Sequence, residues 1–382
     1  MDRPIKIIRS STISSSLDTF CKGQLAMLRD LGYEVVAVST PDDRLEAMAH
    51  REGIRAVGVP MQRHISLRDD LRSLWLMYRL FRREKPYLVH SMTPKAGLIC
   101  MMAAFMARVP KRVHTFTGLI WPTTTGLKRK ILMTTDRILC FCATHIIPEG
   151  QGVLNDLRNH RITGKRMRIL GYGNVRGIDP AYYDRTYEVM VEAEKLLDKD
   201  VFTYVFVGRI VADKGIHELI DAFACVHKKI PGTRLLLVGG QEPELDPLRP
   251  DTIATIDNCP DIVSIGRVDD VRPYLAASDC LVFPSYREGF PNVVLEAGAM
   301  GLPAIVTDIN GSREIVKDGY NGSVIPSHDS EALAEAMAAV VENVEQTARM
   351  ASVSRQHVLS RWSRSIVNEA LLSFYGEILP KP

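Results

Sequence analysis

The chain of 382 residues has no long hydrophobic run, and this absence limits where the protein can reside. Its most apolar window, residues 96–107, is too short to span a bilayer and instead predicts a buried helix. Residues 5–8 form a short strand-like run rather than the long apolar segment of a signal peptide. We therefore expect a cytoplasmic protein that could also lie peripherally on the inner face of the cytoplasmic membrane.

Paired cysteines, metal-ligand clusters and dinucleotide-binding glycines are also missing. Cys140 and Cys142 are separated by one residue rather than two and have no partner pair, so we expect no zinc site. Asp269 and Asp270 lack the Asp-x-Asp spacing of a metal-binding pair, and the capping of a helix is their expected role. No Gly-x-Gly-x-x-Gly motif follows the first strand of either half, which disfavours a dinucleotide-dependent dehydrogenase. The sequence predicts no metal and no cofactor.

The small net charge of +3 hides an uneven distribution along the chain. Residues 1–172 hold 28 Lys and Arg against 14 Asp and Glu, whereas the remainder holds 20 against 31. A basic half favours an anionic membrane surface, a diphosphate-bearing ligand or nucleic acid. Ordinary solvated helix faces would give the same excess. Of these three possible partners, nucleic acid is the one that we do not expect.

Residues 67–85 combine six cations with apolar side chains in one helical segment. Arg68, Arg72 and Arg79 belong to this segment, together with Trp75 and Phe81. A basic amphipathic helix can lie on anionic lipid. It can equally bury its apolar stripe in the core of its own domain. We expect the apolar side to face the core and some of the arginines to face lipid.

Strand-like and helix-like segments alternate along the whole chain, which predicts an α/β fold with parallel, doubly wound sheets. Strands are expected at residues 5–8, 34–38, 56–59, 88–90, 112–115, 144–147, 167–170, 203–207, 234–238, 262–265, 280–283, 304–307 and 322–325. Helices are expected at residues 19–31, 43–52, 67–83, 96–107 and 361–378. The turn-rich segment 171–180 interrupts the pattern. We expect a domain over residues 1–175, a second over 176–360, and a C-terminal helix in 361–382 that packs back on the first.

The most informative segment is residues 284–296, which join a buried strand to a helix. Glu288 lies in its turn, and Glu296 lies in the first turns of the following helix. Junctions at the carboxyl edge of a parallel sheet are where α/β folds bind ligands. Free N–H groups at the helix start suit an anion, and carboxylates suit sugar hydroxyls. A ligand with both features is a nucleotide sugar.

A second junction supports the same ligand. Gly208 follows a predicted strand and permits a sharp turn, and Arg209 and Lys214 bracket the loop that leads into the next helix. Two cations beside a helix N-terminus can bind a diphosphate, because Arg grips phosphate oxygens in pairs and Lys adds a compact charge. Alone, the loop could be a solvated basic turn.

Four further positions are weaker candidates. The backbone near Val268 could hold a base, and His114 could face a sugar, although a lone histidine is more often structural. Ser14 and Ser15 lie in the Ser-rich segment after the first strand, which could line an acceptor site or simply cap a helix near Asp18. Lys95 at a helix start opposes the helix dipole, so it could bind an acceptor phosphate.

These motifs resemble glycosyltransferase family 4, the retaining enzymes of the GT-B fold. The resemblance covers nearly the whole chain and is strongest over residues 207–316. The Glu-x7-Glu motif of the family matches Glu288 and Glu296, and its Gly-Arg…Lys-Gly motif matches Gly208, Arg209, Lys214 and Gly215. Segments 93–97, 115–118 and 284–290 are similar to the branch that builds capsular or lipid-linked glycans on polyprenyl-diphosphate acceptors. The chain departs from the family in its Ser-rich first loop and at Thr117, where many members have a His or an acidic residue.

The resemblance implies two Rossmann-like domains that face a central cleft, and it implies a role for each motif. Arg209 and Lys214 would hold the donor diphosphate, and Glu296 would hold the ribose hydroxyls. The sugar would be met by Glu288 and by the backbone of Gly289, Phe290, Pro291 and Asn292.

The expected reaction is transfer of a hexosyl or N-acetylhexosaminyl unit from a UDP-sugar, with retention and without a metal. The acceptor would be a lipid-linked glycan or an oligosaccharide in surface polysaccharide biosynthesis. A nucleotide-sugar 2-epimerase of the same fold and a non-catalytic nucleotide-sugar-binding subunit are the alternatives. An epimerase would act without an acceptor, and the subunit would bind a nucleotide sugar without turnover.

Overall fold

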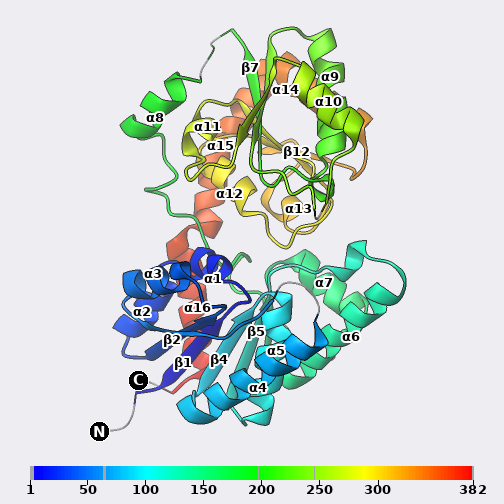
Figure 1. Cartoon of the computed structure of the whole chain (residues 1–382). Coiled ribbons are helices and arrows are strands. Elements are labelled where there is room, and N and C mark those ends of the chain that lie inside the picture. The colour runs from blue at the N-terminus through cyan, green and yellow to red at the C-terminus, as the bar shows by residue number, and fades with distance from the viewer. Residues whose placement is uncertain (1–3, 63–65, 197, 199, 245, 381–382) are drawn as a thin grey trace. The chain divides into compact units, whose positions relative to one another are not determined.

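The chain folds into two compact units in the computed structural model, which describes residues 4–62, 66–196, 198, 200–244 and 246–380 (Figure 1). Unit 1 comprises Met1–Gly177 and Ser365–Pro382, and unit 2 comprises Ile178–Arg364. These divisions fall after residues 177 and 364, whereas the sequence analysis placed them after residues 175 and 360.

Unit 1 is built on a six-stranded parallel sheet in the order β3-β2-β1-β4-β5-β6. The central strands are buried on both faces, as parallel strands covered by helices are. The strands are β1 Lys6–Ser10, β2 Glu34–Ser39, β3 Arg55–Gly58, β4 Leu88–Met92, β5 Lys111–Phe116 and β6 His145–Pro148. The helices are α1 Ser14–Cys21, α2 Gln24–Asp30, α3 Asp43–Glu52, α4 Leu67–Glu84, α5 Pro94–Met106, α6 Gly126–Cys142, α7 Gln151–Asn159 and α16 Arg364–Ile378.

The core of unit 1 contains two apolar clusters, and the last helix supplies part of one of them. Leu371, Phe374 and Tyr375 of α16 pack in a cluster with the buried strand residues of β1 and β2. The Tyr375 hydroxyl lies 2.6 Å from His90 Nδ1 and accepts a 3.3 Å hydrogen bond from Arg9. The other cluster lies beneath α4, α5 and α6. Helix α16 therefore completes the core of a sheet built from the first half of the chain.

Unit 2 repeats the architecture with a parallel sheet in the order β12-β11-β10-β7-β8-β9. Its strands are β7 Phe202–Val207, β8 Thr233–Val238, β9 Ile262–Gly266, β10 Cys280–Phe283, β11 Ala304–Thr307 and β12 Gly322–Ile325. Its helices are α8 Tyr187–Glu194, α9 Ile216–Lys229, α10 Pro250–Asn258, α11 Arg272–Ala276, α12 Asn292–Ala299, α13 Ser312–Ile315, α14 Ser330–Glu342 and α15 Val344–Trp362. The predicted fold class, two doubly wound parallel α/β sheets, is confirmed.

Three predicted elements differ in the structure. The helix expected over 19–31 is two helices, because Gly23 adopts φ 78° between α1 and α2. Residues 167–170 make one bridge, from Met167 to Ile146, because Gly171 and Gly173 turn the chain away with positive φ. The helix expected over 361–378 starts at Arg364, since Ser363 pairs instead with Ile178.

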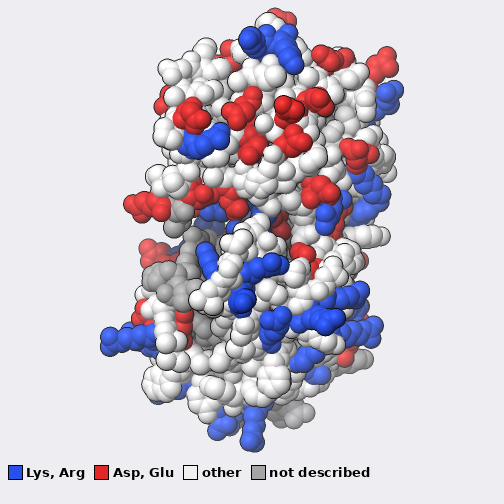
Figure 2. All heavy atoms as spheres, turned by 90° about the vertical axis from the view of Figure 1, so that its right-hand side faces the viewer, with Lys and Arg blue, Asp and Glu red and all other residues white. Residues whose placement is uncertain are grey.

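The uneven charge of the sequence is visible on the molecular surface. Figure 2 shows one face of the molecule, on which Lys and Arg gather over unit 1 while Asp and Glu predominate over unit 2. The two units therefore present different electrostatic surfaces on this face.

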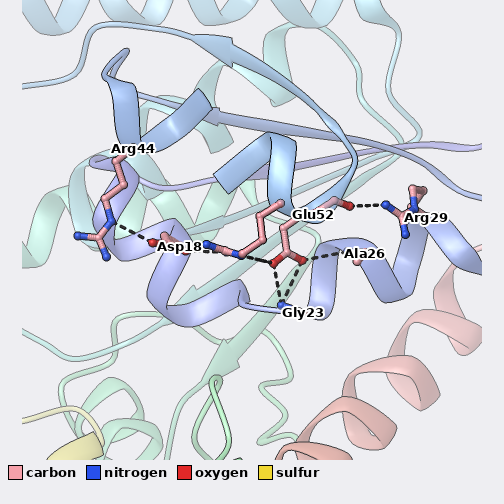
Figure 3. Close-up of polar contacts among 7 residues, drawn as sticks. Asp18, Gly23, Ala26, Arg29, Arg44 and Glu52 are labelled. Atoms are coloured by element: carbon pink, nitrogen blue, oxygen red, sulfur yellow. Dashed lines mark hydrogen bonds and ion pairs between the residues drawn. The ribbon is translucent and has the colours of Figure 1, made fainter. Parts of the chain in front are cut away.

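A buried carboxylate caps helix α2 in unit 1 (Figure 3). Glu52, at the end of α3, accepts hydrogen bonds from the Gly23 N–H at 3.0 Å and the Ala26 N–H at 3.2 Å. Arg51 donates to the same carboxylate and to Asp18, which also accepts from Arg44. Asp18 lies within α1 and pairs with both arginines, whereas the N-cap residue of α1 is Ile13 and no side chain caps that helix. A negative charge at a helix N-terminus is stabilising, so Glu52 joins α3 to α2.

We expect Glu52→Ala to lower the free energy of unfolding by about 1–3 kcal/mol, because two N–H groups at the start of α2 lose their acceptor. Urea denaturation measures this change. Glu46→Ala is the matched control, because Glu46 is exposed on the same helix and its removal should cost less than about 0.5 kcal/mol. Equal losses in the two variants would contradict the capping role.

Candidate functional site

The loops that follow β7 and β10 touch each other at the carboxyl edge of the unit 2 sheet. The two strands are neighbours and run parallel. Gly215 adopts φ 71° at the start of α9, and a Cβ atom there would overlap the carbonyl of Pro284. Only glycine fits this position, because the conformation and the contact both exclude a side chain. This contact brings together the two motifs that the sequence singled out.

Lys214 and Glu288 form an ion pair where these loops meet. Their side chains are only 13% and 17% exposed. Ser285 donates a 3.0 Å hydrogen bond to the same Glu288 oxygen, and the ammonium of Lys214 lies 5.5 Å from the centre of the Phe283 ring. The pair is thus partly shielded from water, which strengthens its electrostatic interaction.

Arg209 lies in the same loop after β7 and lines a groove of about 460 Å³. Its guanidinium donates a 2.7 Å hydrogen bond to Glu242, which lies in the loop after β8. The floor is backbone, because a Cβ atom on Gly239 would overlap the Gly208 carbonyl. Val268, the expected base-binding residue, lies in the loop after β9 and lines the same groove. The groove can therefore hold a flat, polar ligand beside a cation.

Glu242 was not found from the sequence, although a signal exists. It follows Gly239 and Gly240 directly after a buried strand, which is the same kind of position that marked Arg209. Arg267, in the loop after β9, also lines the groove and was not expected from the sequence either. Both become evident only when the strand order puts β7, β8 and β9 side by side.

Glu296 lies on the second turn of α12 and is 8% exposed. The hydroxyl of Tyr183 donates a 2.7 Å hydrogen bond to its carboxylate. Tyr183 is itself buried and precedes the sheet of unit 2 in the chain. The carboxylate is therefore fixed in one orientation before any ligand arrives. Sequence reasoning missed Tyr183, because it lies 113 residues away with no motif around it.

The turn between Glu288 and Glu296 is packed closely on its neighbours. A Cβ atom on Gly311 would collide with the backbone of Gly289 and Phe290 and with the Pro291 ring. Phe290 is buried, with its ring centre 5.7 Å from that of Trp362. Its side chain thus serves the core, and a contact of residues 289–292 with a sugar stays a prediction.

In the acidic pair after β9, Asp269 and Asp270, the second residue has a partner nearby in the chain. Asp270 accepts from the backbone N–H of Arg272 at 3.0 Å and pairs with its guanidinium at 2.6 Å, while the N-cap residue of α11 is Val271. Within the described residues, no group of three or more His, Cys, Asp and Glu side chains is arranged to hold a metal ion.

The candidates in unit 1 make contacts within that unit. His114 lies inside β5, is 1% exposed, and its Nδ1 is 2.9 Å from the Ser91 hydroxyl. Burial lowers the pKa of His114 to about 3, so the imidazole is neutral. Gly97 of α5 packs directly on the ring. A contact between His114 and a sugar stays a prediction.

Ser14, Ser15 and Lys95 all lie at helix starts. Ser14 is buried in α1 and donates to Asp42, and Ser15 is half-buried, so the second half of the Ser-rich segment is helical and only residues 11–13 form a loop. Lys95 at the start of α5 pairs with Asp70 of α4 at 2.7 Å. This ion pair offsets the unfavourable placement of Lys95 at the helix dipole, so an acceptor phosphate would compete with Asp70.

None of the helices in the described ranges is both long and apolar enough to cross a bilayer.

Comparison with known proteins identifies the family. Residues 18–173 match the model of the glycosyl transferase 4-like domain, and residues 201–343 match that of the glycosyl transferases group 1. The capsular polysaccharide biosynthesis glycosyltransferase CapM of Staphylococcus aureus is 34% identical over 98% of this chain and 97% of its own length. The UDP-Gal:alpha-D-GlcNAc-diphosphoundecaprenol alpha-1,3-galactosyltransferase of Escherichia coli is 27% identical over 76% of each chain.

The fold is also shared with solved structures. HepE of Anabaena in complex with UDP superimposes with a TM-score of 0.80 at 19% identity, over 98% of this chain and 100% of that one. Both family models and the full-length likeness to CapM lead to the same assignment. The chain belongs to glycosyltransferase family 4 and is a glycosyltransferase of the GT-B fold.

Proposed function

We propose that this glycosyltransferase moves a hexosyl or N-acetylhexosaminyl unit from a UDP-sugar to a lipid-linked or oligosaccharide acceptor in surface glycan biosynthesis. The partly shielded pair of Lys214 and Glu288, beside the groove of Arg209, carries this proposal. The names of CapM and of the E. coli galactosyltransferase support the substrate classes, because they specify a capsular glycan and a diphosphoundecaprenol acceptor.

The donor would bind with its diphosphate on Arg209 and Lys214. Each cation is neutralised by a carboxylate, Glu242 in one case and Glu288 in the other. A diphosphate offers the same kind of oxygen acceptors with more charge, so it can replace Glu242 on Arg209. When the diphosphate takes over Lys214, Glu288 becomes free to accept hydrogen bonds from sugar hydroxyls.

The reaction would proceed with retention at the anomeric carbon. The bond between that carbon and the diphosphate oxygen breaks, and its electron pair leaves with the UDP. The acceptor oxygen bonds to the same face of the sugar and passes its proton to a leaving phosphate oxygen. Arg209 and Lys214 stabilise the charge that develops on the diphosphate, and such preorganised stabilisation is commonly the largest part of catalysis. Two fixed cations can serve here without a divalent metal.

The proposed donor is tested by thermal unfolding with UDP, GDP and a panel of UDP-sugars in the presence of EDTA. We expect UDP and one UDP-sugar to raise the unfolding midpoint, since a ligand at 100 times its Kd adds about 2.7 kcal/mol of stability. GDP should give a smaller shift. A shift that requires Mg²⁺ would contradict the metal-free mechanism, and no shift with any nucleotide would contradict the donor assignment.

We expect Arg209→Ala and Glu288→Ala each to lower kcat/KM by at least about 100-fold, because each removes a contact to the transition state. The assay measures release of UDP in the presence of acceptor. Glu335→Ala, an exposed change on α14, is the control and should keep normal turnover. Near-normal turnover in either site variant would exclude the assigned role of that residue.

Tyr183 is expected to act as a positioning residue for Glu296. Tyr183→Phe removes only the hydroxyl, so we expect the donor KM to rise about 10-fold, the loss of one hydrogen bond to a charged group, with kcat little changed. Steady-state kinetics with varied donor separates the two constants. A fall in kcat with unchanged KM, or a large loss of thermal stability, would argue for a purely structural role.

A further inference from the structure

Helix α6 exposes an apolar stripe along its outer side. Leu127, Ile131, Ile138 and Phe141 recur at helical spacing and are between 41% and 73% exposed. The opposite side of the helix holds the buried residues, Asp136, Leu139, Cys140 and Cys142. The stripe is thus additional to the apolar side that α6 already uses for the core.

The apolar surface extends over the two neighbouring helices. Phe105, near the end of α5, is exposed and its ring centre lies 5.7 Å from that of Phe141. Helix α4 packs on α5 and exposes a second stripe, Leu67, Leu71 and Trp75. Met106 of α5 is exposed as well. Of the sixteen large apolar side chains that are exposed in the described chain, nine therefore lie on these three helices. Such clustering marks an interaction surface.

All the exposed charged side chains of the three helices are cations. Every residue of α4, α5 and α6 is described, and none of their acidic side chains is exposed. The exposed charges are Arg68, Arg72, Arg79, Arg82, Arg83, Lys128, Lys130 and Arg137. Figure 2 shows basic side chains gathered over unit 1 on the face that it displays.

Cations also lie close to the exposed aromatic rings. The Arg79 guanidinium is 4.6 Å from the centre of the Trp75 ring, and that of Arg112 is 5.5 Å from the Phe105 ring. The Lys165 ammonium is 5.9 Å from the Phe141 ring. Aromatic rings beside long basic side chains suit the headgroup level of a bilayer, where the ring meets the acyl chains and the charge meets phosphate.

We propose that the outer face of α4, α5 and α6, here called the helix face, docks on an anionic membrane surface. Amphipathic helices bind such surfaces by inserting apolar side chains while their cations meet lipid phosphates. The expectation that the apolar side of α4 faces the core holds for Met77 and Phe81, whereas Trp75 is exposed, and the expectations did not include α6. Membrane docking by the helix face does not require the donor. The docking proposal rests on the proposed function only in one respect, namely that a lipid-linked acceptor lies in the same membrane.

The test is sedimentation with vesicles of phosphatidylcholine containing about 30% phosphatidylglycerol, compared with phosphatidylcholine alone. One variant removes apolar contacts, Leu127→Gln, Ile131→Gln and Phe141→Gln together. A second removes charge, Lys128→Gln, Lys130→Gln and Arg137→Gln together. The control, Tyr187→Gln with Val344→Gln, removes two apolar side chains of unit 2 that are at least about as exposed as those changed in α6.

We expect each α6 variant to bind anionic vesicles about 10-fold more weakly than the unmodified chain, and binding to weaken with salt. The control should bind normally. All variants should keep the thermal shift with UDP, which reports on unit 2, so loss of membrane docking is distinguishable from failure of the donor assignment.

Three results would overturn the proposal. The first is equal binding to neutral and anionic vesicles, and the second is unchanged binding by both α6 variants. The third is a stable dimer of the unmodified chain that becomes monomeric in the apolar variant, measured by light scattering without vesicles. That last result would assign the helix face to a second copy of the chain instead.

Discussion

The site in unit 2 depends on backbone contact between loops that follow neighbouring parallel strands. Because Gly215 has no side chain, its loop reaches the carbonyl of Pro284, and Lys214 then meets Glu288. Gly239 packs on Gly208 in the same way and closes the floor of the groove. A methyl group at either contact would separate the loops, and charged side chains a few residues away would lose their partners. The chemistry of the site is therefore set by the absence of side chains beside it.

The sequence was enough to predict the fold class and the two motifs, because buried strands are short apolar runs and the motifs follow them directly. It was not enough where geometry is set by residues distant in the chain. The break at Gly23 depends on Glu52, which reaches the N–H groups of α2 from another helix. Likewise, Tyr183 orients Glu296 across 113 residues of sequence. Periodicity describes which side of an element is buried but not which partner it meets.

The two units use their charges in different ways. In unit 2, Arg209 and Lys214 are each held by one carboxylate at hydrogen-bond distance, and in the proposed function each exchanges this carboxylate for a diphosphate. On α4 and α6 the exposed cations have no exposed acid on the same helices. Such a surface acts collectively over about the Debye length, roughly 8 Å at physiological salt. In the two proposals, the first arrangement selects a ligand and the second attracts a membrane surface.

Unit 1 is made of two pieces of chain with the whole of unit 2 between them. Leu371, Phe374 and Tyr375 join its core only after unit 2 has been synthesised. In a growing chain, α1, α2 and α3 can already cover part of this side of the first sheet, and the rest stays uncovered until α16 has been synthesised. The unit that is synthesised first therefore completes its core last, and its uncovered apolar side chains are exposed to misassembly until then.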